Sequence, residues 1–233
     1  MSDERVMTYD EIETLAARAL IASDVAPENA AAVAKSIAAA ERDGQAIVGL
    51  SYLPTYCDHA ACKKVDGHAQ PRLEQLSPVA LRVDAGTGFA HPAIALGLPA
   101  LIDAARQSGI AALSVTNSYA CGSLGYFVED LAAEGLISLM TANASPSIAP
   151  FGGKTPFFGT NPLAFAVPRD GHAPLVIDQS SSPGLRSLTP TIAVCRCLTA
   201  GPSMRRACRP RMRPRRWRVV FCRSEATRVS GLH

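Results

Sequence analysis

The sequence lacks the segments that carry a chain to or across a membrane. Its N-terminal stretch, MSDERVMTYDE, is charged and has no apolar centre of the kind that a secretory signal needs. No run is long and apolar enough to cross a bilayer. We therefore expect a cytoplasmic protein without a membrane partner, whose seven cysteines are thiols rather than disulfides.

Two nucleotide-binding signatures are also missing. No G-x-G-x-x-G follows a predicted strand, and no G-x-x-x-x-G-K-[ST] occurs; the stretch FGGKTPFFGTNP has its glycines at neither spacing. The cysteine pair Cys195 and Cys197, with Cys208 and Cys222 far along the chain, lacks the spacing of a zinc site. The sequence therefore predicts no Rossmann or P-loop signature and no metal site.

Acidic residues nearly vanish from the last fifty positions. Residues 184–233 contain twelve arginines, no lysine and one acid, Glu225, whereas residues 1–183 contain 11 basic and 19 acidic residues. The formal charge is thus +11 in the tail and −8 in the body, although the whole chain carries only +3. Such a change in composition marks a boundary along the chain.

The body of the chain is predicted to be an α/β protein. Thr8 and Glu11 form a capping-box pattern before an amphipathic helix, and Pro27 suits the first turn of a second helix. From Val79 onward, apolar strands alternate with helices, which indicates a sheet that is at least partly parallel. We divide the chain into an N-terminal helical region, residues 1–75, an α/β domain for cofactor and substrate, residues 76–182, and a basic tail, residues 183–233.

Small polar residues gather where the predicted strands end. Ligands of α/β sheets tend to bind at such ends, and amide and hydroxyl groups suit a polar ligand. These candidate residues are Asn117, Ser118, Asn143, Thr160, Asn161, Asp178, Gln179, Ser180, Ser181 and Ser182.

Several stretches carry a resemblance to a known family. The run SPSIAPFGGKTPFFGTNPLAFAVP, followed by LVIDQSSS, resembles the malate/L-lactate dehydrogenase family, whose NAD(P)-binding domain is not a Rossmann fold. The stretches NSYACGSLGY, GLSYLPTY and VDGHAQP extend the resemblance over about residues 8–182. The details look most like the branch of (2R)-3-sulfolactate dehydrogenases.

The resemblance implies a fold and a reaction. The fold would be a helical N-terminal segment plus a non-Rossmann mixed-sheet cofactor domain, with the family's C-terminal part missing. The reaction would be hydride transfer between NAD or NADP and a small 2-hydroxy or 2-oxo acid, by a chain that forms a homodimer. Of the polar residues at the strand ends, we assign Asn117, Ser118, Asn143, Thr160 and Asn161 to the substrate. The resemblance assigns the cofactor to Asp178, Gln179, Ser180, Ser181 and Ser182.

The chain departs from the family pattern at positions that carry chemistry. The family commonly reads S-H-G-x-x-R-x-P, and its histidine and arginine fall here on Val48 and Tyr52. A second family histidine falls on Ala120. Valine and alanine cannot transfer a proton, and a neutral tyrosine cannot pair with a carboxylate as arginine does. No catalytic residue is assigned. We interpret the remaining histidines as solvated surface residues: His59, His68, His91 and His172.

The arginine-rich tail has two interpretations. A basic arm near an aromatic residue can bind nucleic acid, and a non-catalytic α/β ligand-binding protein with such an arm is the alternative function. However, shifting the reading frame by two bases lets residues 198–212 encode DGWALDAAGLPTTD and residues 221–233 encode LPFGGHKGFGLA, both family-like motifs. We therefore expect an out-of-frame, largely disordered tail, no nucleic-acid partner, and an impaired enzyme.

Overall fold

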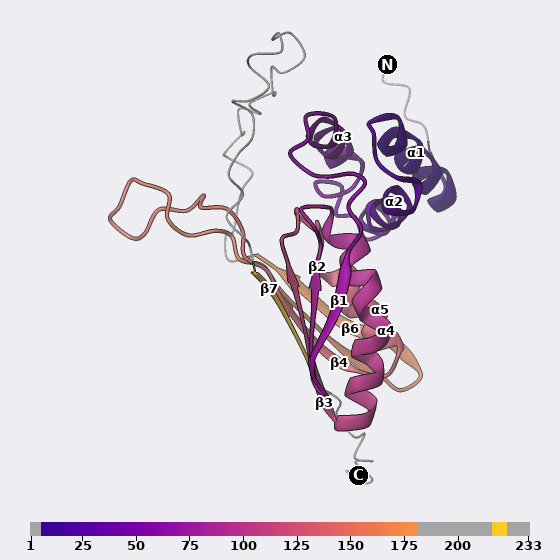
Figure 1. Ribbon diagram of the computed structural model, residues 1–233, viewed down its shortest axis with the longest axis vertical. Coiled ribbons are helices and arrows are strands. Elements are labelled where there is room, and N and C mark those ends of the chain that lie inside the picture. Colours follow the sequence, from indigo (N-terminus) through magenta and orange to yellow (C-terminus); the bar gives the residue numbers. More distant parts are fainter. Residues whose placement is uncertain (1–5, 181–215, 223–233) are drawn as a thin grey trace.

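The computed structural model describes residues 6–180 and 216–222, which form a helical layer above a sheet (Figure 1). The helical layer comes from the N-terminal third of the chain. Its elements are α1 (Tyr9–Ala22), α2 (Pro27–Arg42), the 3₁₀ turn η1 (Leu50–Tyr52) and α3 (Leu53–Ala61).

Local signals in the sequence fix where these helices begin. The side chain of Thr8 accepts a hydrogen bond from the backbone N–H of Glu11, and the Glu11 carboxylate accepts one from the backbone N–H of Thr8, so the predicted capping box is present. Pro27 occupies the first turn of α2, where its missing N–H costs nothing. Apolar residues of α1, α2 and α3 then form one core, which includes Leu20, Val33 and Tyr56.

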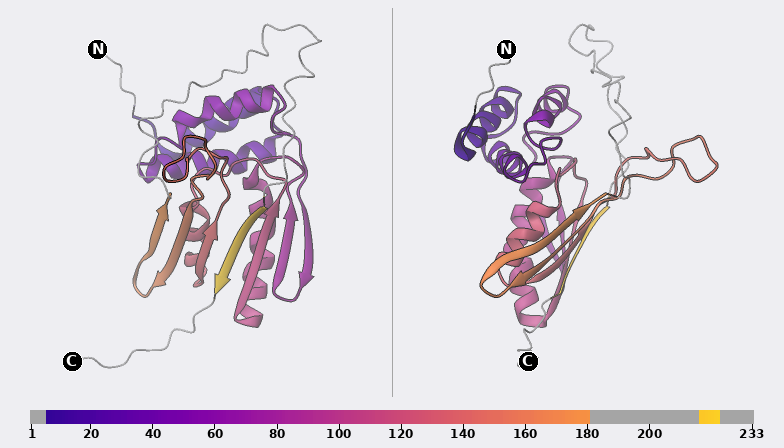
Figure 2. Two further views of the ribbon diagram at one scale, coloured as in Figure 1. Left: turned by 90° about the vertical axis from the view of Figure 1, so that its left-hand side faces the viewer. Right: turned by 180° about the vertical axis from the view of Figure 1, so that it is seen from behind.

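Among the described residues, the sheet has seven strands in the order β1-β2-β3-β7-β4-β5-β6. The strands are β1 (Arg72–Ser77), β2 (Ala80–Asp84), β3 (Ile110–Thr116), β4 (Ile137–Thr141), β5 (Leu163–Arg169), β6 (His172–Gln179) and β7 (Arg216–Cys222). Only β2 and β3 pair in parallel, and the other pairings are antiparallel. The predicted mixed sheet is therefore confirmed. These pairings make β2, β3, β4 and β6 run in one direction, so all four end at the edge beside the helical layer (Figure 2).

Helices α4 (Ala90–Ser108) and α5 (Gly125–Ala133) cover one face of this sheet (Figure 2). Leu113 and Val83 lie in the core beneath them. Gly97 lets α4 approach closely, because a Cβ there would lie only 2.7 Å from Cδ2 of Leu113. Of the helices that the structure describes, none is long and apolar enough to cross a membrane.

Two strands were not predicted from the sequence. Residues before Val79, where the sequence predicted no strand, form β1, which pairs with β2. In the tail, Arg216–Cys222 forms β7, which pairs with β3 on one side and β4 on the other. These seven residues are ordered by pairing, because each neighbouring strand offers a row of backbone groups that need partners. A largely disordered tail stays a prediction. The rest of the predicted tail lies outside the described residues.

Candidate functional site

The candidate site lies along the edge where the strands end, below the helical layer. Five predicted residues come together there, around the ends of β4 and β6 and the start of β5: Asn143, Thr160, Asn161, Gln179 and Ser180. The amide oxygen of Asn161 accepts a hydrogen bond from the backbone N–H of Ala144, at 3.1 Å. The Ser180 hydroxyl donates to the carbonyl of Thr160 at 3.5 Å. Ser181 and Ser182 lie outside the described residues.

A glycine makes this close approach possible. A Cβ at Gly159 would lie 2.3 Å from the carbonyl oxygen of Ala144 and 2.8 Å from the amide oxygen of Asn161. No larger residue fits there without moving the backbone. The glycine of the G-T-N-P motif therefore brings the segment after β4 against the segment before β5.

Asp178 lies on the opposite face of β6 from the residues beside it in the chain, Gln179 and Ile177. One carboxylate oxygen accepts a hydrogen bond from the Ser123 hydroxyl at 2.8 Å and another from the backbone N–H of Gly125 at 2.7 Å. Gly125 is the first residue of α5, where a negative charge is favourable. The Asp178 carboxylate therefore holds a helix terminus.

Asn117 and Ser118 follow β3 and lie farther along the same edge. Asn117 has φ +51°, its carbonyl accepts a hydrogen bond from Thr87 at 2.7 Å, and its amide donates to Asp84 at 3.1 Å. Ser118 is buried, and within the described part of the chain its hydroxyl has no hydrogen-bond partner. The structure thus splits the predicted site into two groups, one at β3 and one at β4 to β6.

The segment that matches the family's histidine and arginine is well ordered by its backbone. The Glu41 carboxylate accepts a hydrogen bond from the N–H of Leu50 at 2.6 Å, and a Cβ at Gly49 would collide with that carboxylate. The ring of Tyr52 packs edge-on against Tyr56, with centroids 4.8 Å apart. Val48 is partly buried. Neither position therefore offers a proton donor of histidine type or a cation.

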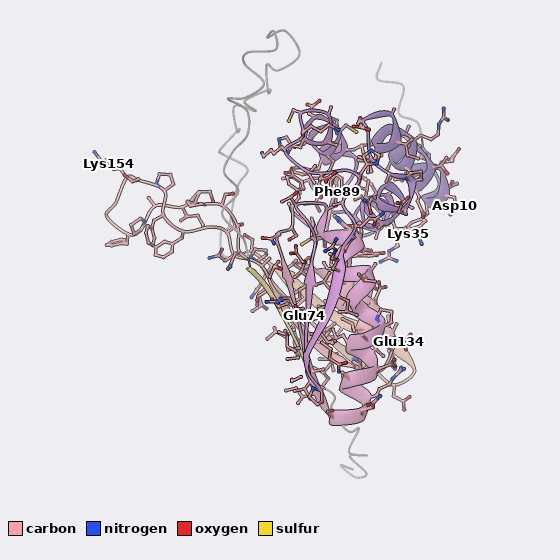
Figure 3. The ribbon with its side chains drawn as sticks, viewed as in Figure 1. Asp10, Lys35, Glu74, Phe89, Glu134 and Lys154 are labelled. Carbon is pink, nitrogen blue, oxygen red and sulfur yellow. The ribbon has the colours of Figure 1, made fainter. Side chains whose placement is uncertain are left out.

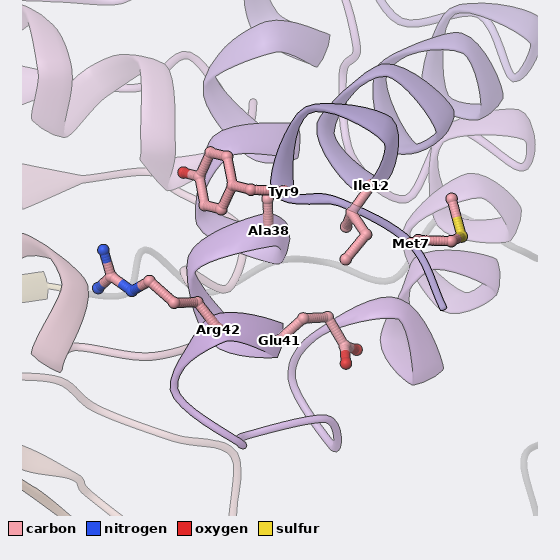
Figure 4. Close-up of a pocket in the computed structure, with 6 residues that line it drawn as sticks. All are labelled: Met7, Tyr9, Ile12, Ala38, Glu41 and Arg42. Carbon is pink, nitrogen blue, oxygen red and sulfur yellow. The ribbon is translucent and has the colours of Figure 1, made fainter. Parts of the chain in front are cut away.

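A cavity of about 600 Å³ lies between α1 and α2 (Figure 4). It is lined by Met7, Tyr9, Ile12, Ala38, Glu41 and Arg42. The guanidinium of Arg42 is paired with Asp43 and Glu129, at 2.7 and 2.8 Å. The cavity contains none of the predicted site residues, and we assign it no part in the site.

His59 makes a contact that the sequence analysis missed. Its Nδ1 lies 2.5 Å from the Tyr119 hydroxyl, and its Nε2 lies 3.2 Å from Nζ of Lys64. Because a protonated lysine can only donate, Nε2 is the acceptor and Nδ1–H donates to Tyr119. Burial, and then the charge of Lys64, lower the pKa of His59, which keeps the ring neutral. His59 and Tyr119 are 60 positions apart in the chain, so no local sequence pattern predicts their contact.

His91 contradicts its interpretation as a surface residue. Its side chain is only 2 % exposed and lies between the rings of Tyr56 and Phe127. Burial lowers the pKa of His91 to about 4, although the backbone of Cys121 acts in the opposite direction. His68, which contacts Asp24, and His172 are exposed, as predicted.

The sequence profile for malate/L-lactate dehydrogenases matches residues 7–186 of this chain. A curated relative, the (2R)-3-sulfolactate dehydrogenase (NADP(+)) of Chromohalobacter salexigens, is 47% identical over 178 residues. That alignment covers 76% of this chain and 53% of the relative. A Delta(1)-pyrroline-2-carboxylate/Delta(1)-piperideine-2-carboxylate reductase of Pseudomonas syringae pv. tomato is 37% identical and is covered to 52% of its length.

Solved structures show the same likeness. The crystal structure of delta1-piperideine-2-carboxylate reductase from Pseudomonas syringae aligns with a TM-score of 0.74 at 37% identity, over 76% of this chain and 53% of that one. A malate dehydrogenase from Entamoeba histolytica aligns with a TM-score of 0.72 at 28% identity, over 77% and 50%. The chain therefore spans about half the length of the relatives that it matches.

Removing the charge of Asp178 tests its role at α5. We expect Asp178→Asn to lower the free energy of unfolding by about 1–2 kcal/mol. The neutral amide oxygen is a weaker acceptor than the carboxylate, and it brings no negative charge to the N-terminus of α5. Urea unfolding followed by circular dichroism measures the change. Asp170→Asn, in the exposed turn between β5 and β6, is the matched control; an equal loss in both variants would contradict this role.

The buried His91 predicts acid sensitivity. Its pKa is about 4 in the folded chain against an ordinary 6.5, so folding favours the neutral ring. This contribution, about 3 kcal/mol, is complete above pH 6.5 and is lost as the pH falls through 4. Stability measured by urea unfolding should therefore fall less steeply between pH 6.5 and 4 in His91→Gln than in the parent. His172→Gln, in an exposed turn, should keep the parental slope; identical slopes in all three proteins would refute the assignment.

Proposed function

The chain belongs to the malate/L-lactate dehydrogenase family, and from that premise we propose that it is an NAD(P)-dependent oxidoreductase for small carboxylic acids. The observation that carries the proposal is the family match over residues 7–186, which includes every polar residue at the strand ends. The named relatives act on sulfolactate and on cyclic imines that bear a carboxylate. The substrate we propose is accordingly a 2-hydroxy or 2-oxo acid, with a cyclic 2-imino acid as the second candidate.

The strand-end residues suit the nicotinamide riboside portion of NAD or NADP. The amide group of Gln179 and the hydroxyl of Ser180 can donate to and accept from a carboxamide and ribose hydroxyls. When bound, the nicotinamide ring supplies or takes up the hydride at C2 of the substrate. We propose that Gln179 and Ser180, with Ser181 and Ser182 beyond them, hold the cofactor, and that Asp178 supports them by capping α5.

We propose that the substrate binds toward the β3 end of the edge. Asn117 and Ser118 would orient a polar substrate from the β3 side, and Asn143, Thr160 and Asn161 would contact it from the group at β4 to β6. The Ser118 hydroxyl is buried without a partner among the described residues, and leaving such a group unpaired costs about 1–3 kcal/mol. A substrate oxygen would satisfy it.

The proton required by the reaction needs a donor other than Val48 or Ala120. Tyr119 directly precedes Ala120 in the chain, and its hydroxyl accepts a hydrogen bond from Nδ1–H of His59. A phenol that accepts this bond can still donate its own O–H to a substrate oxygen. We propose Tyr119 as the donor, with His59 and Lys64 as positioning residues. Without the family's arginine, nothing at position 52 pairs with the carboxylate, so we propose an impaired enzyme.

The homodimer expected from the family is part of the same proposal. We also propose that the residues from about Pro183 are translated out of frame. The two family-like motifs in the shifted frame support this, as does the profile match, which stops at residue 186.

The alternative, a non-catalytic ligand-binding protein with a basic arm for nucleic acid, is favoured by the twelve arginines of residues 184–233.

The reading frame can be checked directly. We expect the gene, sequenced from the codon of Leu175 through and past the stop, to show a gained or lost base near Ser182. Restoring the frame should raise NAD(P)H-dependent reduction of the oxo acids that correspond to sulfolactate, malate and lactate. An intact frame, together with salt-sensitive nucleic-acid binding that disappears when residues 184–233 are deleted, would instead support the alternative.

Restoring the two missing side chains tests the site. We expect Val48→His with Tyr52→Arg to raise kcat/KM at least about 100-fold, because a proton donor and a carboxylate partner return together. The assay is NAD(P)H oxidation with the 2-oxo and cyclic 2-imino acids, in the chain as given and in the frame-restored chain. Val48→Leu with Tyr52→Phe is the matched control. No gain in either background would contradict this placement of the site.

A further inference from the structure

Two loops meet at the strand ends beside the helical layer. One loop, residues 85–88, follows β2, and the other, residues 117–119, follows β3. Because β2 and β3 pair in parallel, with Asp84 opposite Thr116, both loops leave the sheet at the same level. Backbone hydrogen bonds of 2.7 to 2.9 Å join the loops into one unit: Ala85 donates to Thr116, Thr87 to Asn117 and Tyr119 to Gly88.

An aromatic residue holds this unit against the helical layer. Phe89, the N-cap residue of α4, follows the loop after β2 and is only 1% exposed. It lies where the sheet edge meets the helical layer (Figure 3). Its ring packs edge-on against Tyr56 of α3 and against Tyr119 of the second loop, with centroids 5.8 Å apart in both pairs. Both loops therefore have a fixed place relative to the strand ends.

The side chain of Asp84 joins the two loops a second time. Its Oδ1 accepts hydrogen bonds from the backbone N–H of Gly86 at 2.9 Å and from the side-chain amide of Asn117 at 3.1 Å. An ionised carboxylate can only accept, so the Asn117 side chain must turn its nitrogen toward Asp84. The amide oxygen then faces away from Asp84, and within the described part of the chain it accepts no hydrogen bond.

The backbone of Asn117 is constrained as well. Its φ of +51° lies in the left-handed region, which asparagine enters more readily than most residues. Its carbonyl accepts a hydrogen bond from Thr87. Thr87 thus fixes the main chain and Asp84 fixes the amide, so the direction of the amide oxygen is set before any ligand binds. Such preorganisation lowers the entropic cost of binding.

We infer that Asp84 is a positioning residue, and that the Asn117 amide oxygen which it orients selects ligands with a hydrogen-bond donor on C2. The inference rests on the proposed function, which places the substrate beside Asn117. A protonated cyclic 2-imino acid carries an N–H at that carbon and a 2-hydroxy acid carries an O–H, whereas a 2-oxo acid presents only an acceptor. An acceptor that loses water and gains no donor weakens binding, so the 2-oxo acid is disfavoured.

Ser118 supplies the complementary group. Its hydroxyl is buried and has no partner among the described residues, and it can donate to a substrate carboxylate. Residues 117 and 118 then offer an acceptor and a donor next to each other in the chain. A 2-hydroxy or protonated 2-imino acid offers the reverse, a donor on the carbon that carries the carboxylate.

The test compares acids that differ at C2. Pyrrole-2-carboxylate has an N–H where furan-2-carboxylate has a ring oxygen, and lactate has an O–H where pyruvate has an oxo group. Calorimetry on the full chain, with and without NADP+, gives the dissociation constants. We expect the donor-bearing acid to bind at least about 10-fold more tightly. Selection in one pair alone supports the inference and identifies N–H or O–H as the donor. Equal affinities in both pairs, or no binding of any of the four acids, overturn it.

Two substitutions test whether Asp84 acts through Asn117. Asn117→Gly removes the amide while glycine tolerates the left-handed backbone, and it should abolish the selection. Asp84→Ala should reduce the selection about 5-fold in the parent and not at all in Asn117→Gly, because no amide remains to be oriented. Asp66→Ala is the matched control, since Asp66 also accepts from the backbone N–H two residues on at 2.9 Å but contacts no asparagine.

A conservative variant keeps the test decisive if Asp84→Ala folds poorly. Asp84→Asn retains an acceptor oxygen, so it should keep most of the selection, and circular dichroism checks the fold of each variant. Full selection in Asp84→Ala, or an equal loss in Asp66→Ala, overturns the inference. Binding ratios require no hydride transfer, so turnover without selection overturns this inference alone, and selection without turnover contradicts only the proposed reaction.

Discussion

The carboxylate of Asp178 is the contact on which the sheet edge depends. Asp178 lies on the edge strand β6. Its carboxylate accepts hydrogen bonds from the N–H of Gly125, the first residue of α5, and from the Ser123 hydroxyl. Through these two bonds it fixes the loop between β3 and α5, and that loop carries Asn117, Ser118 and Tyr119. A charged acceptor at a helix N-terminus is among the stronger hydrogen-bonding arrangements in proteins. The two groups of site residues therefore share one anchor, although Asp178 faces away from the group beside it in the sequence.

The loop after β3 is joined to the loop after β2 by backbone hydrogen bonds and to the helical layer by a ring contact. Thr87 donates to the carbonyl of Asn117, and Tyr119 donates to the carbonyl of Gly88, at 2.7 and 2.8 Å. Tyr119 also packs edge-on against Tyr56 and Phe89, with centroids 6.0 and 5.8 Å apart. The loop after β3 thus belongs to both layers, which places the His59 contact next to the strand ends.

Sequence reasoning succeeded where the governing interaction is local. The capping box at Thr8, Pro27 in the first turn of α2, and the polar strand ends each depend on residues a few positions apart. It failed where the partner is distant. Nothing near His91 in the chain shows that two aromatic rings enclose it, and β7 is a strand only because β3 and β4 each present an unpaired edge. Asp178 was grouped with Gln179 because the two are adjacent, whereas alternation along a strand sends them to opposite faces.

At residues 47–52, the backbone contacts can be considered apart from the side chains at the family's histidine and arginine positions. The Glu41 carboxylate accepts a hydrogen bond from the N–H of Leu50 there, and a Cβ at Gly49 would displace that carboxylate. The backbone that would present the family's histidine and arginine is therefore in place, while the side chains at Val48 and Tyr52 cannot do their work. A backbone hydrogen bond does not depend on which side chain the turn carries. The fold of this segment therefore persists with valine at position 48 and tyrosine at position 52.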